Sequence, residues 1–268
     1  MIEFREPPQT GFELRWSLFG VRFRVLPSFF LISAIFAAVI LWPLARNPVT
    51  LAIAIAIDVT CIFFAIVFTE FVQGLVYRSY GLQSTAVLQE FGGGIYPEQE
   101  PPSALQRIVA FLSNPASSFL LFAIVYYSDL HYKWSQTSLL AEFAYFILYV
   151  VSLFWGIIGL LPIFPYPGGR VMLEVLNLIS PRSGLALTLV VSIIVGLAYI
   201  VYVVAIRFLH NMREIPLVEG HMLPANVFLA IFIALATAHN WQLLGYVRAQ
   251  QRPYPTDDYE DQAPWEKK

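Results

Sequence analysis

The sequence predicts a mainly α-helical membrane protein that crosses the bilayer several times and carries a small membrane-associated β-sheet. Of its 268 residues, 58% are hydrophobic and only 13% are charged, whereas a soluble domain has roughly 45–50% apolar and about 25% charged residues. Six apolar segments are long enough to be transmembrane helices. Two short segments alternate between apolar and other residues, as β-strands do.

Charge and cysteine content narrow the function classes. The net charge of -2 is too small to indicate nucleic acid or another strongly charged partner. A single cysteine, Cys61, excludes an internal disulfide framework, and we expect it to be a small buried apolar side chain. The polar start of the chain lacks the pattern of a cleavable signal peptide, so the first apolar segment is expected to act as an uncleaved insertion signal.

Residues 1–26 are predicted to form a cytoplasmic N-terminal segment that contains a β-hairpin. The apolar positions with a period of two are Leu14, Trp16 and Leu18 and, after Phe19-Gly20, Val21, Phe23 and Val25. Arg22 and Arg24 take the positions between them. We expect the hairpin to lie at the membrane surface with these arginines in water or among lipid head groups.

The transmembrane domain is predicted to extend over residues 27–247, because a helical span needs about 20 apolar residues. The six predicted spans lie near residues 28–44, 49–77, 104–127, 138–161, 184–206 and 224–246. The third is expected to begin with a capping box formed by Ser103 and Gln106 and to be kinked at Asn114-Pro115.

The distribution of lysine and arginine predicts the orientation. With a cytoplasmic amino terminus, the inside segments carry 12 of these residues and the outside loops carry 4. Because positive charge accumulates in cytoplasmic loops, both termini are expected on the cytoplasmic side of the cell membrane. The polar tail, residues 248–268, is predicted to be disordered.

Two connections differ from ordinary loops. Residues 81–102 hold an alternating stretch, the triplet Gly92-Gly93-Gly94 and an acidic, proline-rich turn. Residues 160–179 begin with irregular, proline-rich backbone and then resume a short helix, in which Arg170 and Glu174 are spaced for an ion pair. Irregular backbone at membrane depth persists only where protein or a water-filled cavity satisfies it.

Three segments resemble, in order and in spacing, the site-2 protease family of intramembrane zinc metalloproteases. "GVRFRVLPSFFLI" is similar to the family's entry strand and first helix. "TEFVQGLVYRSYG" and the residues after it resemble an H-E-x-x-H helix, a hairpin with a Phe-Gly-Gly turn and a Gly-Pro-x-x-Asn helix. "LLPIFPYPGGRVMLEVL" is similar to the motif Asn-x-x-Pro-x-x-x-x-Asp-Gly-Gly-Arg. The resemblance implies a site-2 protease-like core that covers nearly the whole chain up to the fifth span.

The resemblance also implies that the zinc ligands of the family are missing from this sequence. In the family, two histidines and an aspartate hold zinc, and a glutamate acts as general base on the metal-bound water. Glu70 keeps the general-base position, whereas Thr69, Gln73 and Pro167 take the three ligand positions. Zinc prefers thiolate, imidazole and carboxylate donors. We therefore expect no zinc and no catalysis.

Several accessory positions differ from the family as well. Asn114 stands at the glycine and Ser118 at the asparagine of Gly-Pro-x-x-Asn, and Gly159 stands at the asparagine of Asn-x-x-Pro. The stretch "STAVLQEF" is predicted either to present a strand edge to an extended peptide or to form a buried hairpin that positions the next helix. The candidate groove comprises Phe91, Gly92, Gly93, Asn114, Pro115, Ser118, Gly159, Pro162 and Gly168.

Three functions stay open at this point. The first is a non-catalytic pseudoprotease in the lipid bilayer that binds or regulates transmembrane segments of other proteins. The second is an active intramembrane metalloprotease with an atypical site. The third is a transporter-like protein that uses a polar cavity around Asp58, Glu70 and Asn114. A relocated metal site would need His239. The alternative is that His239 and Asn240 each form ordinary hydrogen bonds to other helices.

Overall fold

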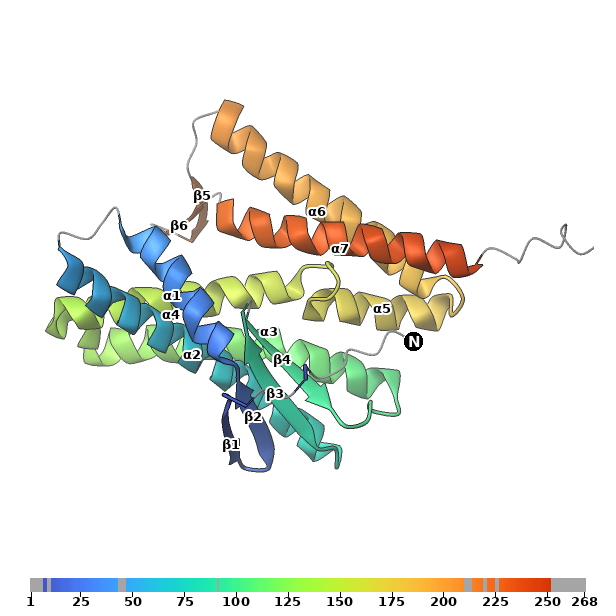
Figure 1. Ribbon diagram of the computed structural model, residues 1–268, viewed down its shortest axis with the longest axis horizontal. Coiled ribbons are helices and arrows are strands. Elements are labelled where there is room, and N and C mark those ends of the chain that lie inside the picture. The colour runs from blue at the N-terminus through green and yellow to red at the C-terminus, as the bar shows by residue number, and fades with distance from the viewer. Residues whose placement is uncertain are drawn as a thin grey trace, which may run out of the picture. The chain divides into compact units, whose positions relative to one another are not determined.

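Figure 1 shows the computed structural model of the protein, which is mainly helical. It describes residues 7–8, 11–42, 47–90, 92–209, 214–218, 221–224 and 227–251. The chain divides into two compact units: Met1–Leu161 with Tyr166–Glu174, and Pro162–Pro165 with Val175–Lys268. Each unit is described by itself.

The α-helices of the first unit are α1 (Pro27–Leu41), α2 (Pro48–Ser79), α3 (Ala104–Tyr132), α4 (Leu139–Leu160) and the first part of α5 (Pro167–Ile179). Three of them begin with a side-chain cap, from Asn47 in α2, Ser103 in α3 and Ser138 in α4. The predicted capping box of α3 is confirmed, since Ser103 Oγ accepts a hydrogen bond from the Gln106 N–H at 3.2 Å. Pro115 lies inside α3, and the helix continues past it.

Four of the six predicted spans are confirmed by length and composition. Over the described residues, α2, α3, α4 and the part of α6 from Gly184 to Ala205 are long and apolar enough to cross a membrane. At 15 residues, α1 is shorter than the roughly 20 that a span needs. α7 (Val227–Gln251) has suitable length, but His239, Asn240 and Gln242 interrupt its apolar sequence. The count of six spans is therefore approximate.

The first unit also contains a four-stranded sheet in the order β1-β2-β3-β4. Its strands are β1 (Leu14–Leu18), β2 (Val21–Val25), β3 (Ser84–Gln89) and β4 (Gly92–Pro97). The predicted hairpin is confirmed, because β1 and β2 pair antiparallel with Trp16 opposite Phe23. β3 pairs parallel with β2 and antiparallel with β4, so that the two hairpins form one sheet.

This topology corrects one expectation. The stretch "STAVLQEF" supplies β3, which is hydrogen-bonded to a neighbour on both sides and is mostly buried. It therefore cannot present an edge to a peptide, and the alternative of a buried hairpin strand holds. Among the described strands of this sheet, the outer positions belong to β1 and β4.

One face of the sheet packs on the last turns of α2. Val21, Phe23 and Ala86 form a buried cluster against Trp16, Val67 and Phe71. Gly74 of α2 permits this contact, because a Cβ atom there would lie 2.6 Å from Val21 Cγ1. The sheet is thus fixed to the carboxyl-terminal part of a membrane span.

The second unit contains the remainder of α5, α6 (Gly184–Leu209), the antiparallel strands β5 (Glu214–Val218) and β6 (His221–Pro224), and α7. Neither β5 nor β6 is predicted from the sequence. The loop before α5 is hydrogen-bonded to α6 and to α7. Phe164 N–H donates to Ser192 Oγ of α6 at 2.9 Å, and Asn240 Nδ2 of α7 donates to Phe164 O at 2.7 Å. Residues 252–268, most of the predicted tail, lie outside the described residues.

Candidate functional site

The candidate site is built around one helical face of α2. Thr69, Glu70 and Gln73 are all buried there. Asn114 of α3 reaches this face, and its Nδ2 atom donates to Glu70 Oε1 and to Gln73 Oε1, each at 3.2 Å. One amide group thus connects α3 to two side chains of α2.

Thr69 is hydrogen-bonded within its own helix. Its Oγ1 donates to the backbone carbonyl of Ile66 at 2.9 Å, one turn earlier on the same helix. This back-bonding is common for threonine inside helices. It occupies the only hydrogen of the hydroxyl group within α2.

Glu70 is only partly satisfied. The residue is 4% exposed, and among the described residues its Oε2 atom has no hydrogen-bond partner. A buried polar atom without a partner costs free energy. An arginine lies in the same region: Arg170 Cζ is 5.5 Å from the centre of the Phe111 ring. Burial lowers the pKa of this guanidinium, and the nearby acidic side chain of Glu70 acts against that shift.

β4 passes directly over Glu70. A Cβ atom on Gly93 would lie 2.8 Å from Glu70 Oε1 and 2.6 Å from Ile66 Cγ2. No side chain fits there without displacement, so glycine lets the backbone of this outer strand approach the carboxylate.

Two further glycines of the predicted groove permit close helix packing. A Cβ on Gly159 would lie 3.1 Å from Pro115 Cβ, which brings α4 against α3. One on Gly168 would lie 2.5 Å from Leu160 O, which brings the start of α5 against the end of α4. Ser118 Oγ donates to Asn114 O at 3.3 Å and so stays within its own helix.

The other predicted positions are distributed as follows. Pro167 is the first residue of α5, next to Gly168 in the first unit. Pro162 belongs to the second unit. Gly92 begins β4 with a φ of 123°. Phe91 lies outside the described residues.

One ion pair near the site is not predicted from the sequence. Arg107 of α3 donates to Glu174 of α5 at 2.9 Å, and both side chains are largely buried. The sequence predicts a pair of Glu174 with Arg170, one turn away on the same helix, and that pair stays a prediction. The observed pair joins residues 67 positions apart, which no local spacing rule could indicate.

The donors at this site do not fit zinc. A back-bonded hydroxyl, an amide and a proline stand at the three predicted ligand positions, and Glu70 alone has a preferred donor type. Over the described part of the chain, no three His, Cys, Asp or Glu side chains are grouped so that they could hold a metal. His239 is exposed on α7.

Asp58 does not join the cluster either. It lies on α2 about 18 Å before Glu70 along the helix axis, at 1.5 Å per residue. The structure therefore brings Asn114 to Glu70 but leaves Asp58 apart. This separation removes the main support for a polar transport cavity shared by the three residues.

Comparison with solved structures identifies the fold. The chain is similar to a site-2 protease from Methanocaldococcus jannaschii, with a TM-score of 0.51 and 16% sequence identity, over 86% of this chain and 94% of that one. No protein-family model matches the chain, and no curated protein matches it by sequence. The protein is thus a mainly helical membrane protein with a site-2 protease-like fold.

Proposed function

We propose that the protein is a non-catalytic pseudoprotease, which binds segments of other membrane proteins without cutting them. The observation that carries this proposal is the bridge from Asn114 to Glu70 and Gln73. Hydrogen bonds within the protein engage Thr69 and Gln73, two of the three positions at which the resemblance implies metal ligands.

The chemical consequence is a large loss of metal affinity. Structural zinc sites bind with on the order of 10–16 kcal/mol at neutral pH, and that energy comes from charged or imidazole donors. Thr69, Gln73 and Pro167 supply none of these donors. Glu70 then has no metal-activated water from which to take a proton.

The surface proposed for binding is the outer edge of β4. An extended peptide can add to an outer strand through main-chain hydrogen bonds. Gly92, Gly93 and Gly94 carry no side chains that would hinder such an approach, and Gly93 lies against Glu70. A bound segment would therefore run past the buried cluster.

We also propose that the protein resides in the cell membrane with both termini in the cytoplasm. The excess of lysine and arginine in the segments on that side supports this orientation. Labelling of single cysteines introduced near the N-terminus, in a chain that carries Cys61→Ser, tests it.

Metal content and cleavage decide between the pseudoprotease and an active enzyme. The purified full chain should contain far less than one zinc per molecule and should leave single-span membrane substrates intact. An established site-2 protease prepared in parallel controls for metal loss during purification. Stoichiometric zinc, together with cleavage that disappears in Glu70→Gln, would overturn the proposal.

A further inference from the structure

The face of the sheet that points away from α2 carries three arginines. Arg15 lies opposite Arg24 in the β1–β2 ladder, and Arg22 lies two residues from Arg24 on the same side of β2. Thr85 of β3 lies opposite Arg22, and Tyr96 of β4 lies opposite Thr85. Because side chains alternate along a strand, all five share one face. We call Arg15, Arg22 and Arg24 the arginine face.

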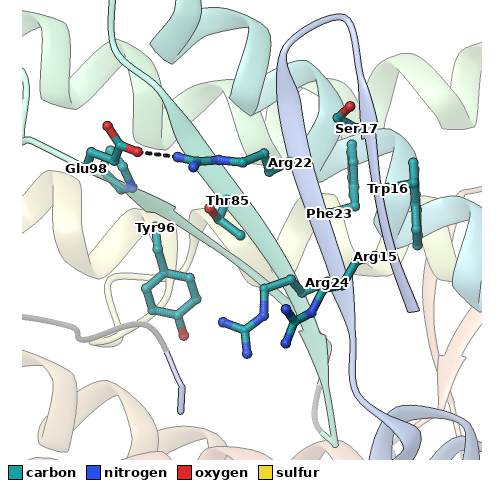
Figure 2. Close-up of a pocket in the computed structure, with 10 residues that line it drawn as sticks. Arg15, Trp16, Ser17, Arg22, Phe23, Arg24, Thr85, Tyr96 and Glu98 are labelled. Atoms are coloured by element: carbon teal, nitrogen blue, oxygen red, sulfur yellow. Dashed lines mark hydrogen bonds and ion pairs between the residues drawn. The ribbon is translucent and has the colours of Figure 1, made fainter. Parts of the chain in front are cut away.

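A pocket of about 510 Å³ opens on this face. Its lining residues are Arg15, Trp16, Ser17, Arg22, Phe23, Arg24, Thr85, Tyr96, Pro97 and Glu98. Figure 2 shows Arg15 beside Arg24, with Arg22, Thr85 and Tyr96 around the same space. Guanidinium and hydroxyl groups gathered in this way are the donors that recognise phosphate.

Among the residues that the structure describes, the carboxylates of Glu13 and Glu98 pair with these arginines and leave part of the face exposed. Glu13 accepts from Arg24 at 2.8 Å and from Arg15 at 3.1 Å. Its side chain is 0% exposed, whereas that of Arg15 is 48% exposed, so the carboxylate lies beneath the guanidinium groups. Glu98 pairs with Arg22, and both side chains are about half exposed. An exposed pair of this kind is weak and can rearrange around an incoming anion.

Arg24 has a different role from the other two. It is 5% exposed and donates to Glu13 as well as to the carbonyls of Pro7 and Pro8, at 3.2 and 3.3 Å. These bonds hold Pro7 and Pro8 against the sheet. Arg24 therefore positions the face, while Arg15 and Arg22 are accessible to a ligand.

The location of the hairpin indicates that the ligand is a lipid. The Phe19 ring lies 6.1 Å from that of Phe71 near the end of the α2 span, and Gly20 lies against Arg78. On the opposite side of β1 from the arginines, Leu14 and Leu18 are 58% and 41% exposed. A hairpin with exposed leucines on one side and arginines on the other, at the end of a membrane span, suits the bilayer interface.

We infer that the arginine face binds the phosphate of an anionic phospholipid, with Arg15 and Arg22 contacting the head group and the exposed leucines of β1 directed toward the acyl chains. This inference does not depend on the proposed binding of protein segments at β4. The same donors could bind inorganic phosphate, so the test separates the two sources.

The experiment measures lipid binding to the purified full chain by native mass spectrometry in detergent. Phosphatidylglycerol, phosphatidylcholine and inorganic phosphate are titrated separately. We expect saturable binding of phosphatidylglycerol, much weaker binding of phosphatidylcholine and little binding of inorganic phosphate. In R15Q/R22Q, affinity for phosphatidylglycerol should fall roughly thirtyfold, since two arginines near an anionic surface are removed.

The matched control is R182Q/R248Q, which removes two exposed arginines of the second unit. It should bind phosphatidylglycerol like the unmodified protein. Where R15Q/R22Q does not fold, Arg22→Gln alone replaces it, because the pair with Glu98 is exposed. The inference is overturned by equal affinity for the two lipids, by equal losses in the variant and the control, or by inorganic phosphate that binds as tightly as phosphatidylglycerol. An acidic peptide is the alternative anionic ligand, and residues 256–262 of this chain, "TDDYEDQ", provide one. If this peptide binds more tightly than phosphatidylglycerol, the inference is overturned.

Discussion

The Nδ2 atom of Asn114 lies 3.2 Å from Oε1 of Glu70. This contact joins α3 to α2 at a buried position, and the same amide also serves Gln73. In the proposed correspondence with the site-2 protease motifs, position 114 would hold a glycine, whereas here the Asn114 side chain lies beside Glu70. Because Asn114 Nδ2 donates to both Glu70 and Gln73, this hydrogen bonding supports the proposal that the site does not hold a metal ion.

Removal of that amide should destabilise the protein. In Asn114→Ala, Glu70 Oε1 and Gln73 Oε1 both lose their donor in a buried place. We expect a loss of about 1–3 kcal/mol in the free energy of unfolding, measured by thermal or denaturant unfolding in detergent.

A double-mutant cycle tests whether the loss comes from this contact. Asn114→Ala and Glu70→Ala are measured separately and together. Coupling of more than about 0.5 kcal/mol is expected for side chains in contact. Simple additivity would show that the two residues act independently.

A second prediction concerns the approach of β4 to the cluster. Gly93→Ala would place a Cβ 2.8 Å from Glu70 Oε1, so that the strand or the carboxylate has to move. Overpacking of this kind costs typically 1–3 kcal/mol. Gly94→Ala is the matched control, because the atoms nearest its Cβ are those of Tyr96 at 3.5 Å. Equal melting temperatures for the two variants would contradict the close packing of β4 on Glu70.

Local patterns predicted the local elements of this fold. Alternation from Leu14 to Val25 gave the β1–β2 hairpin, and Ser103 with Gln106 gave the start of α3. The parallel pairing of β2 with β3 could not be predicted in this way, because α1 and α2 separate the two strands in the chain. The outer position of β4 follows from that pairing and not from its own residues.

The same limit applies to the candidate site. The resemblance placed Thr69, Glu70 and Gln73 on one face of α2, where they are buried together. It did not indicate that Asn114 would donate to two of them, or that Thr69 would bond back to its own helix. These contacts depend on side-chain conformation and on distances between helices, which spacing in the sequence does not determine.

The pair Arg107–Glu174 should hold the start of α5 to α3. Both side chains are largely buried, and Arg107 also donates to Pro101 O at 2.8 Å. In Glu174→Gln the guanidinium loses its charged partner, and we expect about 1.5–3 kcal/mol of destabilisation in detergent unfolding. The exposed pair Arg22–Glu98 provides the comparison, since Glu98→Gln should change stability by no more than about 1 kcal/mol. A loss in Glu174→Gln no greater than in Glu98→Gln would mean that the buried pair does not contribute to α5 docking.

The last prediction concerns introducing the three zinc ligands of the site-2 protease family, which tests whether the backbone around Glu70 can still form a metal site. The variant T69H/Q73H/P167D introduces two histidines at i and i+4 on α2 and an aspartate at the first residue of α5. Histidines at this spacing lie on one helical face and can reach one zinc ion, and an aspartate is favourable at a helix amino terminus. Since the surrounding fold is site-2 protease-like, we expect about one zinc per molecule by elemental analysis and a melting temperature that rises with zinc and falls with a chelator.

Two controls make that result decisive. T69H/Q73H, which lacks the aspartate, should bind zinc more weakly because it supplies one donor fewer. Adding Asn114→Gly to the three substitutions should increase the affinity, since it removes the side chain that now bridges Glu70 and Gln73. If both the triple and the quadruple variants fold and remain free of metal, then the close approach of Gly93 to Glu70 has closed the site, and the resemblance at these positions does not extend to a metal-binding geometry.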